Sequence, residues 1–286
     1  MEKWIDLHTH TSFSDGMLTP SELVQLAYKK GLSAIAVTDH DCVFGVKEAV
    51  NAGERLGITI IQGVELSTVH NGMTIHIVGL FINPDNAPLV NTITTAQNEV
   101  MKRNILIFDK LALMGFNDLS IADLQSTFHI STPVRWHISK YLEIKGYATS
   151  ATEARAKYLG KGKEAYVEST HKELSVYEAI SLIHGSGGFA FLSHPKRYKL
   201  DDIELSQMML HYKERGLDGI EAYHFGCTDA DTKGLLSFAK TNDLLISGGS
   251  DFHGSHSPDR KLGIAYGQER VPYSVLSTLL YMESSD

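Results

Sequence analysis

Two histidines and a carboxylate stand near the start of the chain, in the segment MEKWIDLHTHTSFSDG. His8 and His10 occupy alternate positions directly behind a short apolar run, and Asp15 follows closely. Side chains at positions i and i+2 of an extended segment lie on the same face, so both imidazoles can point at one ion. Mixed imidazole and carboxylate ligands suit Zn²⁺, Mn²⁺ or Fe²⁺. The segment therefore predicts part of a metal site, which needs further ligands from elsewhere in the chain.

Candidate ligands follow or lie within most of the other short apolar runs. The motifs that carry them are VTDH, GVELS, HIVGLF, LSHP and GGSDFHG. Their ligand-type residues are His40, Glu65, His76, His194, Asp251 and His253. A lone histidine in any one of these motifs would be unremarkable as a buried or turn residue. Ligand-type residues recur at most of the apolar runs, and this recurrence predicts a shared site.

The elements that must position these residues alternate between strands and helices. Apolar runs typical of strands cover 4–7, 34–38, 59–64, 75–81, 189–193, 219–223 and 244–248. Helical patterns lie between them, and the first has Thr19 as N-cap, Pro20 at N1 and Glu22 at N3. This alternation predicts an α/β fold with mainly parallel strands, as a nearly closed barrel or, alternatively, an open doubly wound sheet. Parallel barrels build active sites at the carboxyl ends of their strands, where these ligands stand.

One pair of strands is predicted to be antiparallel. Asn71-Gly72 separates two alternating runs, which is the strongest short signal for a β-hairpin. A two-residue turn there places Ser67 opposite His76 and puts Glu65 on the same face as Ser67. Glu65 and His76 are then diagonal neighbours, within reach of one ion.

The alternation breaks in the middle of the chain. Residues 115–172 read as helix after helix, so we interpret them as a mostly helical insertion that forms a substrate-binding cap. The strand-helix domain then comprises residues 1–114 and 173–286.

Composition narrows the class of protein. The chain has 286 residues, 43% of them hydrophobic, and no apolar run long enough for a membrane helix. It has a formal net charge of −8, which argues against a basic groove for long nucleic acids. Two distant cysteines and the lack of a signal-peptide pattern indicate a reducing cytoplasm. No membrane partner and no protein partner are expected.

Taken together, the motifs DLHTHTSFSDG, VTDHD, GVELS, HIVGLF, LSHPKRY and GGSDFHG resemble the PHP family, named for polymerase and histidinol phosphatase. The resemblance implies a distorted (β/α)₇ barrel that binds two or three divalent ions, Mn²⁺ first and Zn²⁺ or Fe²⁺ as alternatives. It implies a first metal held by His8, His10, Glu65 and Asp251. The second would take Glu65, His76 and His194, and the third Asp15, His40 and His253.

The helical segment from Pro133 to Glu168 resembles the PHP subfamily of 3′,5′-nucleoside bisphosphate phosphatases, which includes RNase AM. This resemblance implies hydrolysis of the 3′-phosphate of a nucleoside 3′,5′-bisphosphate, and trimming of short 5′-phosphorylated oligonucleotides from the 5′ end. The expected substrate-binding residues are Arg135, His137, Lys163 and Arg197. His224 is the candidate donor of a proton to the leaving 3′-oxygen. Trp136 and Ser257 depart from the subfamily pattern, which usually has proline and often lysine there.

Two alternatives stay open at this point. One is histidinol-phosphate phosphatase, or another small phosphomonoesterase, with the same fold and metals. The other, from a different class, is an inactive PHP module that binds metal without catalysis. The amidohydrolase superfamily also begins with His-x-His, but its usual bridging residue is a modified lysine rather than a glutamate.

Overall fold

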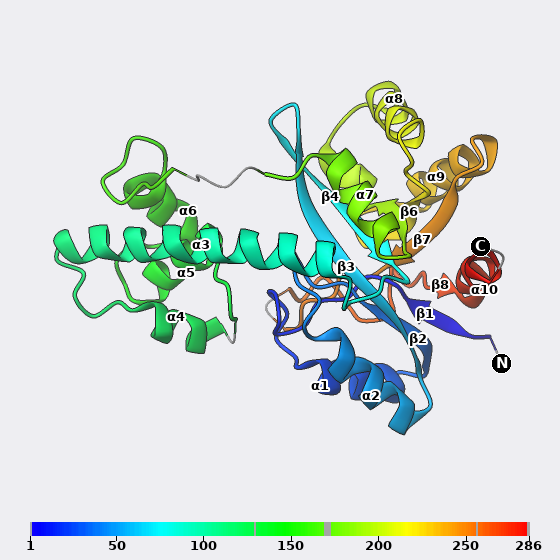
Figure 1. Cartoon of the computed structure of the whole chain (residues 1–286), viewed down its shortest axis with the longest axis horizontal. Helices are drawn as coiled ribbons and strands as arrows, with labels where there is room; N and C mark the ends of the chain where they lie inside the picture. Colours follow the sequence, from blue (N-terminus) through cyan, green and yellow to red (C-terminus); the bar gives the residue numbers. More distant parts are fainter. Residues whose placement is uncertain (1, 129, 169–172, 256, 285–286) are drawn as a thin grey trace. The chain divides into compact units, whose positions relative to one another are not determined.

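The computed structural model describes residues 2–128, 130–168, 173–255 and 257–284. The chain forms two compact units (Figure 1). One comprises Met1–Val90 with Glu173–Asp286, and the other is Asn91–Lys172. The second unit begins earlier than the predicted insertion 115–172, because Ile107 and Leu111 belong to its core. Residues 169–172, at the end of the predicted insertion, lie outside the described residues.

The first unit contains a sheet with the strand order β7-β6-β5-β4-β3-β2-β1-β8. The strands are β1 (Trp4–Asp6), β2 (Leu32–Val37), β3 (Thr59–His70), β4 (Met73–Leu80), β5 (Phe189–Leu192), β6 (Gly219–His224), β7 (Leu245–Gly249) and β8 (Val271–Pro272). All seven predicted strands are present. Strand β8 was not predicted, because a strand of two residues is too short to show an alternating pattern; it pairs with the start of β1.

Main-chain hydrogen bonds join the segment after β1 to the segment after β7. Leu7 N donates to Gly248 O at 3.0 Å, and His10 N donates to Phe252 O at 3.0 Å. In the other direction, Asp251 N donates to His8 O at 3.0 Å. These bonds close most of the gap between the two ends of the sheet. The prediction of a nearly closed α/β barrel is confirmed.

The predicted hairpin is confirmed in register as well as in position. Ser67 pairs with His76 and His70 pairs with Met73, which leaves Asn71 and Gly72 as the turn. Both turn residues have positive φ, 51° and 76°, as a two-residue turn of the favoured hand requires. The pairing brings His76 to the same face as Glu65.

Helices pack around the sheet of the first unit (Figure 1). They are α1 (Pro20–Lys29), α2 (Val46–Leu56), α7 (Val176–Gly185), α8 (Asp202–Lys213), α9 (Asp229–Thr241) and α10 (Tyr273–Glu283), with a short 3₁₀-helix, η2, at Pro195–Tyr198. The capping box predicted for α1 is present, since Glu22 N donates to Thr19 Oγ1 and Thr19 N donates to Glu22 Oε2. Buried residues such as Ile5, Leu7 and Phe191 form the core.

All the regular secondary structure described in the second unit is helical. It contains most of α3 (Ala87–Leu113), together with α4 (Ile121–Phe128), α5 (Arg135–Ile144), α6 (Ala151–Ala154) and the π-helix η1 (Arg155–Leu159). Its own core includes Ile138, Tyr141 and Leu159. No described helix of the chain is long and apolar enough to span a membrane.

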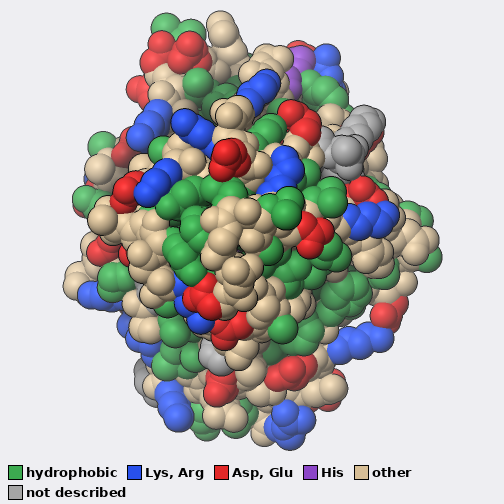
Figure 2. Space-filling model, turned by 90° about the vertical axis from the view of Figure 1, so that its left-hand side faces the viewer, with side chains coloured by type: hydrophobic (Ala, Val, Ile, Leu, Met, Phe, Trp, Pro, Cys, Tyr) green, Lys and Arg blue, Asp and Glu red, His purple; other side chains and the backbone are tan. Residues whose placement is uncertain are grey.

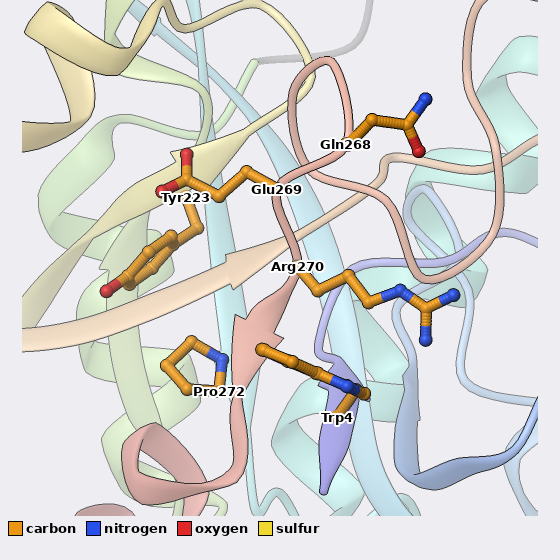
Figure 3. Close-up of a pocket in the computed structure, with 6 residues that line it drawn as sticks. All are labelled: Trp4, Tyr223, Gln268, Glu269, Arg270 and Pro272. Carbon is orange, nitrogen blue, oxygen red and sulfur yellow. The ribbon is translucent and has the colours of Figure 1, made fainter. Parts of the chain in front are cut away.

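A pocket of about 490 Å³ lies where β1 meets β8. Figure 3 shows its lining, which consists of Trp4, Tyr223, Gln268, Glu269, Arg270 and Pro272. None of these is a predicted site residue. Trp4 opens β1, whereas His8 and His10 follow the end of that strand, so the pocket and the candidate ligands lie toward opposite ends of β1.

Candidate metal centre

Glu65 lies at the centre of the predicted ligands and is fully buried. Its Oε2 atom faces three imidazoles: His8 Nε2 at 3.1 Å, His10 Nε2 at 3.3 Å and His40 Nδ1 at 3.2 Å. Main-chain pairing supports this arrangement, because His40 forms a parallel bridge with Glu65 at the edge of β2 and β3.

The other carboxylate oxygen of Glu65 faces a different pair of histidines in the cluster of candidate ligands. Oε1 lies 3.1 Å from His76 Nδ1 and 3.1 Å from His194 Nε2. One carboxylate therefore contacts two separate sets of histidines, one through each oxygen. This is the geometry expected of a residue that bridges two ions, as the hairpin register predicted.

Asp251 completes the set that contains the two opening histidines. Its Oδ1 atom lies 3.2 Å from His10 Nε2 and 3.6 Å from His8 Nε2. Together with Glu65, these residues offer ligand atoms that all lie within 4.8 Å of one another. Four residues from three different segments of the first unit thus converge on a volume that one ion could fill.

Asp15, His40 and His253 also come together, with His10 beside them. His253 Nε2 lies 3.2 Å from Asp15 Oδ1, and His40 Nε2 lies 3.9 Å from Asp15 Oδ2. A further group combines His40 with Glu65 and His76. His40 therefore lies between the regions expected for the second and third ions. All nine predicted ligands lie in one connected cluster.

The donor set fits a divalent transition metal. His8 Nε2 and His10 Nε2 face each other at 3.1 Å, an arrangement in which a shared cation can use both lone pairs. His40 Nδ1, which faces Glu65 Oε2 at 3.2 Å, is buried and has no hydrogen-bond partner among the described residues. Burial opposes the charge on Glu65, but His8, His40 and His76 hold the pKa of Glu65 well below its usual range. The carboxylate is therefore ionised, as a metal ligand must be.

A buried carboxylate that sequence analysis did not identify holds two of these ligands. Glu221 Oε1 accepts a hydrogen bond from His8 Nδ1 at 2.7 Å, and Oε2 accepts one from His194 N at 2.7 Å. A hydrogen on Nδ1 leaves the lone pair of His8 Nε2 free to face the ion. The only signal in the sequence was a charged residue inside the apolar run 219–223.

Two more buried carboxylates shape the backbone beside the ligands. Asp39 accepts hydrogen bonds from Thr11 N at 2.7 Å and Ser14 Oγ at 2.5 Å, which fixes the loop after His10. Asp6 accepts from Ser250 N at 2.9 Å and Gly263 N at 2.8 Å. Both carboxylates are occupied by main-chain N–H groups and by serine or threonine hydroxyls, and they belong to none of the three candidate ligand groups.

The backbone is strained at two of the candidate ligands. His194 has φ 36° and ψ 58°, and Asp251 has φ 53°, so both occupy the left-handed region that non-glycine residues rarely adopt. His194 also precedes Pro195, which disfavours helical conformations. Such strain is concentrated at functional sites, where the surrounding structure enforces it. Here it accompanies two side chains that are turned into the cluster.

Two arginines border the cluster on the outer oxygen of Asp251. Arg197 donates a hydrogen bond to Asp251 Oδ2 at 3.0 Å, and Arg260 forms an ion pair with the same oxygen at 2.8 Å while donating to the main-chain oxygen of Asp251 at 3.2 Å. Both guanidinium groups lie over the ring of Phe225, at 5.8 Å and 4.7 Å. Arg197 was predicted from LSHPKRY. Arg260 was not, because nothing in its local sequence indicated which way its loop would turn.

His224 is buried beside the same carboxylate. Its Nδ1 accepts a hydrogen bond from Gly226 N at 3.1 Å, so the ring carries its hydrogen on Nε2. Nε2 lies 3.6 Å from Asp251 Oδ2 and has no hydrogen-bond partner among the described residues. In this tautomer, His224 offers a hydrogen-bond donor at the edge of the cluster.

The three other predicted substrate-binding residues belong to the second unit. Arg135 opens α5 and donates to Leu159 O at 3.2 Å and Val167 O at 2.7 Å. His137 is buried, and its Nδ1 accepts from Val134 N in the first turn of that helix. Lys163 is exposed in a turn closed by its own N–H to Gly160 O. His137 and Arg135 thus have roles inside the unit.

Comparison with known proteins adds independent information. The sequence matches the model of the PHP domain over residues 6–202. It is 36% identical over 258 residues to a 5′-3′ exoribonuclease of Haemophilus influenzae, covering 88% of this chain and 91% of that protein. It is 31% identical over 259 residues to a 3′,5′-nucleoside bisphosphate phosphatase of Chromobacterium violaceum, covering 91% and 90%.

A solved structure is similar over nearly the whole chain. The protein, from Bifidobacterium adolescentis, is described as a metal-dependent phosphoesterase. It shares 28% sequence identity with this chain at a TM-score of 0.77, covering 98% of this chain and 96% of that one. The matched motifs, the barrel and the full-length relatives agree, and the chain belongs to the PHP family.

Proposed function

We propose that this chain is a metal-dependent phosphoesterase that removes the 3′-phosphate from nucleoside 3′,5′-bisphosphates. By the same chemistry, it trims short 5′-phosphorylated oligonucleotides from the 5′ end. The observation that carries the proposal is the convergence of histidines and carboxylates on the two oxygens of Glu65. The relatives named as a bisphosphate phosphatase and an exoribonuclease support the substrate class. The cytoplasm is the expected location.

Two or three divalent ions are proposed as cofactors, with Mn²⁺ as the preferred metal. The proposed ligands are His8, His10, Glu65 and Asp251 for the first ion, Glu65, His76 and His194 for the second, and Asp15, His40 and His253 for the third. Such ions lower the pKa of bound water and neutralise charge on phosphoryl oxygens. The role of Glu65 and Asp251 is to keep negative charge buried where the ions bind.

The chain itself supplies further groups to the phosphate. Arg197 and Arg260 bring two planar forks to one edge of the cluster, and guanidinium groups match phosphate oxygens well. The side chain of Arg197 is 42% exposed and that of Arg260 is 17% exposed, so Arg197 is the more accessible to a substrate. We propose that both bind the 3′-phosphate, while basic groups of the helical unit bind the 5′-phosphate.

His224 is proposed to act on the leaving 3′-oxygen. The hydrogen on Nε2 can stabilise negative charge that develops on that oxygen, since the ring is buried and held by Gly226 N. This role needs only the hydrogen-bond donor that the tautomer provides, whereas delivery of a proton would need a charged ring.

Phosphate release from a substrate panel tests the proposed reaction. With Mn²⁺ present, we expect adenosine 3′,5′-bisphosphate to be hydrolysed at least about 100-fold more efficiently than histidinol phosphate. A site that uses two separate phosphate contacts strongly rejects a substrate lacking one of them. Steady-state kinetics on both compounds would measure the ratio.

The same panel separates the alternatives. Faster turnover of histidinol phosphate would overturn the nucleotide assignment and leave the metal chemistry intact. A folded protein that bound metal but released phosphate from neither compound would identify an inactive module. An oligonucleotide with and without its 5′-phosphate reports on the exonuclease activity.

Surface charge favours small substrates. Figure 2 shows that, on the face it presents, Lys and Arg side chains are interspersed with Asp and Glu around a hydrophobic centre. Long single strands are usually bound by a groove of positive charge, which this face does not provide. The net charge of −8 agrees with that reading. Mononucleotides and short oligonucleotides do not need such a groove, so this distribution of charge is compatible with both as substrates.

Glu221→Gln is expected to weaken metal binding by about 10- to 100-fold, as loss of a carboxylate behind a histidine ligand typically does. The substitution keeps the size of the side chain but removes the charge that holds the hydrogen on His8 Nδ1. Titration of metal-free protein with Mn²⁺, followed by calorimetry, measures the affinity without reference to turnover.

Asp39→Asn provides the matched control for this variant. It removes a buried carboxylate of the same unit that accepts its side-chain hydrogen bonds from Thr11 and Ser14 and not from a ligand imidazole. We expect it to lower thermal stability more than metal affinity. Equal losses of metal affinity in both variants would show that Glu221 acts only through general stability.

A further inference from the structure

A tyrosine beside the metal centre contacts two of the proposed ligands. Tyr198 is the last residue of the 3₁₀-helix η2, which follows directly after His194. Its hydroxyl oxygen accepts a hydrogen bond from His76 N at 3.0 Å, and its ring centroid lies 5.6 Å from that of His194. His76 and His194 are the two histidines that face Oε1 of Glu65. Tyr198 thus contacts the pair proposed to bind the second ion.

The hydroxyl of Tyr198 takes the place of a strand partner. Strands β4 and β5 are antiparallel, and their pairing reaches Ile77 and Leu192, where β5 ends. One residue further on, Ser193 N still donates to His76 O at 3.1 Å. Opposed residues that form such a bond in an antiparallel pair normally exchange both of their main-chain bonds. Here the return bond from His76 N goes to Tyr198 instead.

The backbone is strained on both sides of η2. His194 precedes this helix with φ 36°, and Lys199 follows it with φ 56°. Both residues therefore occupy the left-handed region, which non-glycine residues rarely adopt. The chain leaves the line of β5 at the first of them, and the single turn between them carries Tyr198 back to His76. Strain of this kind persists only where the surrounding structure enforces it, and it is concentrated at functional sites.

Tyr198 and Glu221 support different combinations of ligands. Glu221 joins His8 to the main chain of His194, and so connects a ligand of the first ion with one of the second. Among the described residues, the hydrogen bond of Tyr198 and its contact with a ligand ring involve only His76 and His194. Loss of the Tyr198 hydroxyl should therefore affect one ion position rather than all of them.

We propose that Tyr198 is a positioning residue for the second ion. Its hydroxyl fixes the main chain of His76 relative to His194, so that both imidazoles face the same oxygen of Glu65. The proposal rests on the proposed function for the presence of that ion. Groups behind metal ligands orient them, and their loss typically weakens metal binding by about 10- to 100-fold.

Tyr198→Phe tests the proposal with the least change in shape. Burial raises the pKa of the Tyr198 hydroxyl, so this group is protonated at neutral pH and the substitution removes no charge. Metal-free, full-length protein is titrated with Mn²⁺ in a calorimeter. We expect one ion per chain to bind about 10- to 100-fold more weakly than in the unaltered protein, while the affinity for the other ions changes by less than about threefold.

The dependence of turnover on Mn²⁺ concentration provides a second measurement. For adenosine 3′,5′-bisphosphate, the Mn²⁺ concentration that gives half of the maximal rate should rise by about 10- to 100-fold in Tyr198→Phe. The rate at saturating Mn²⁺ should stay within about threefold of the original, because mass action restores the ion. A tyrosine that served only general stability would lower the rate at every Mn²⁺ concentration.

Hydrogen exchange tests the contact itself without any metal. In Tyr198→Phe, the amide of His76 loses its acceptor, and we expect it to exchange about fivefold faster or more. The amides of the other β4 residues should keep their rates, since their strand partners are unchanged. Residue-resolved exchange, followed by NMR, measures both.

Tyr177→Phe is the matched control. Tyr177 lies on α7 in the same unit, and its hydroxyl contacts the Nε2 atom of His211 on α8, which is not a proposed ligand. The chemical change is identical, and we expect Mn²⁺ binding to change by less than about twofold.

Three results separate this proposal from the proposed function. Tyr198→Phe that binds every ion as tightly as the unaltered protein, or binds all of them equally more weakly, would overturn the positioning role alone. An unchanged exchange rate of the His76 amide would do the same. Unaltered protein that binds no Mn²⁺ would overturn the proposed function itself, before any variant is compared.

Discussion

Glu65→Gln is expected to lower kcat/KM for adenosine 3′,5′-bisphosphate by about 10³-fold or more, since metal ions contribute several kcal/mol to such reactions and each 1.36 kcal/mol is tenfold in rate. Glutamine has the same shape but no charge. In the native protein, the two oxygens of Glu65 contact five histidines, so a single change removes the anion shared by two ion positions. Metal content per chain, determined by mass spectrometry, should fall in parallel with turnover.

Glu48→Gln is the control for this variant. Glu48 lies on α2 in the same unit and accepts a hydrogen bond from Ser21 N at 3.0 Å, away from the ligands. The chemical change is identical, and we expect metal content and turnover to stay near those of the unaltered protein. If Glu65→Gln also retained its metal and its rate, the bridging role assigned to Glu65 would be wrong.

Removal of metal by a chelator is expected to abolish activity, by about 10³-fold or more, while leaving the fold intact. The core of the barrel is made of residues such as Ile5, Ile61 and Phe191, none of which belongs to the cluster. The buried carboxylates also retain partners, since Asp251 contacts two arginines and Glu65 contacts the histidines. Circular dichroism should therefore be little changed, and Mn²⁺ should restore turnover.

Readdition of different ions makes this experiment specific. Mn²⁺, Zn²⁺ and Fe²⁺ tolerate imidazole ligands, whereas Ca²⁺ prefers a site made of oxygens. We expect Ca²⁺ to restore little activity. Full turnover by protein shown to contain no metal would contradict the assignment of the cluster as a catalytic centre.

The fold could be predicted largely because strand signals are local. Each of the seven apolar runs corresponds to a strand, and the turn at Asn71-Gly72 fixed the register that brings His76 beside Glu65. Strand β8 escaped prediction because a two-residue strand has no periodicity. The earlier start of the helical unit also escaped, because α3 is one uninterrupted helix whose residues belong to both units.

Most of the candidate metal ligands could be predicted because they follow or lie within the apolar runs. Position relative to a strand end indicated where His8, Glu65 and Asp251 would meet. It gave no information on Arg260, which reaches Asp251 from a loop. For Glu221 the only signal was a charge inside an apolar run, which does not indicate the partner of that charge. Such contacts depend on tertiary packing, which no local pattern encodes.

The hydrogen bonds between the segments that follow β1 and β7 also bear on how the protein is made. His8 and His10 leave the ribosome early, but Asp251, whose N–H binds His8 O, is synthesised about 240 residues later. Domains fold during synthesis from the N-terminal side, so the early histidines must wait for the last part of the barrel. A nascent chain therefore cannot capture its full complement of ions, and it acquires the power to degrade nucleotides only after translation of this region is finished.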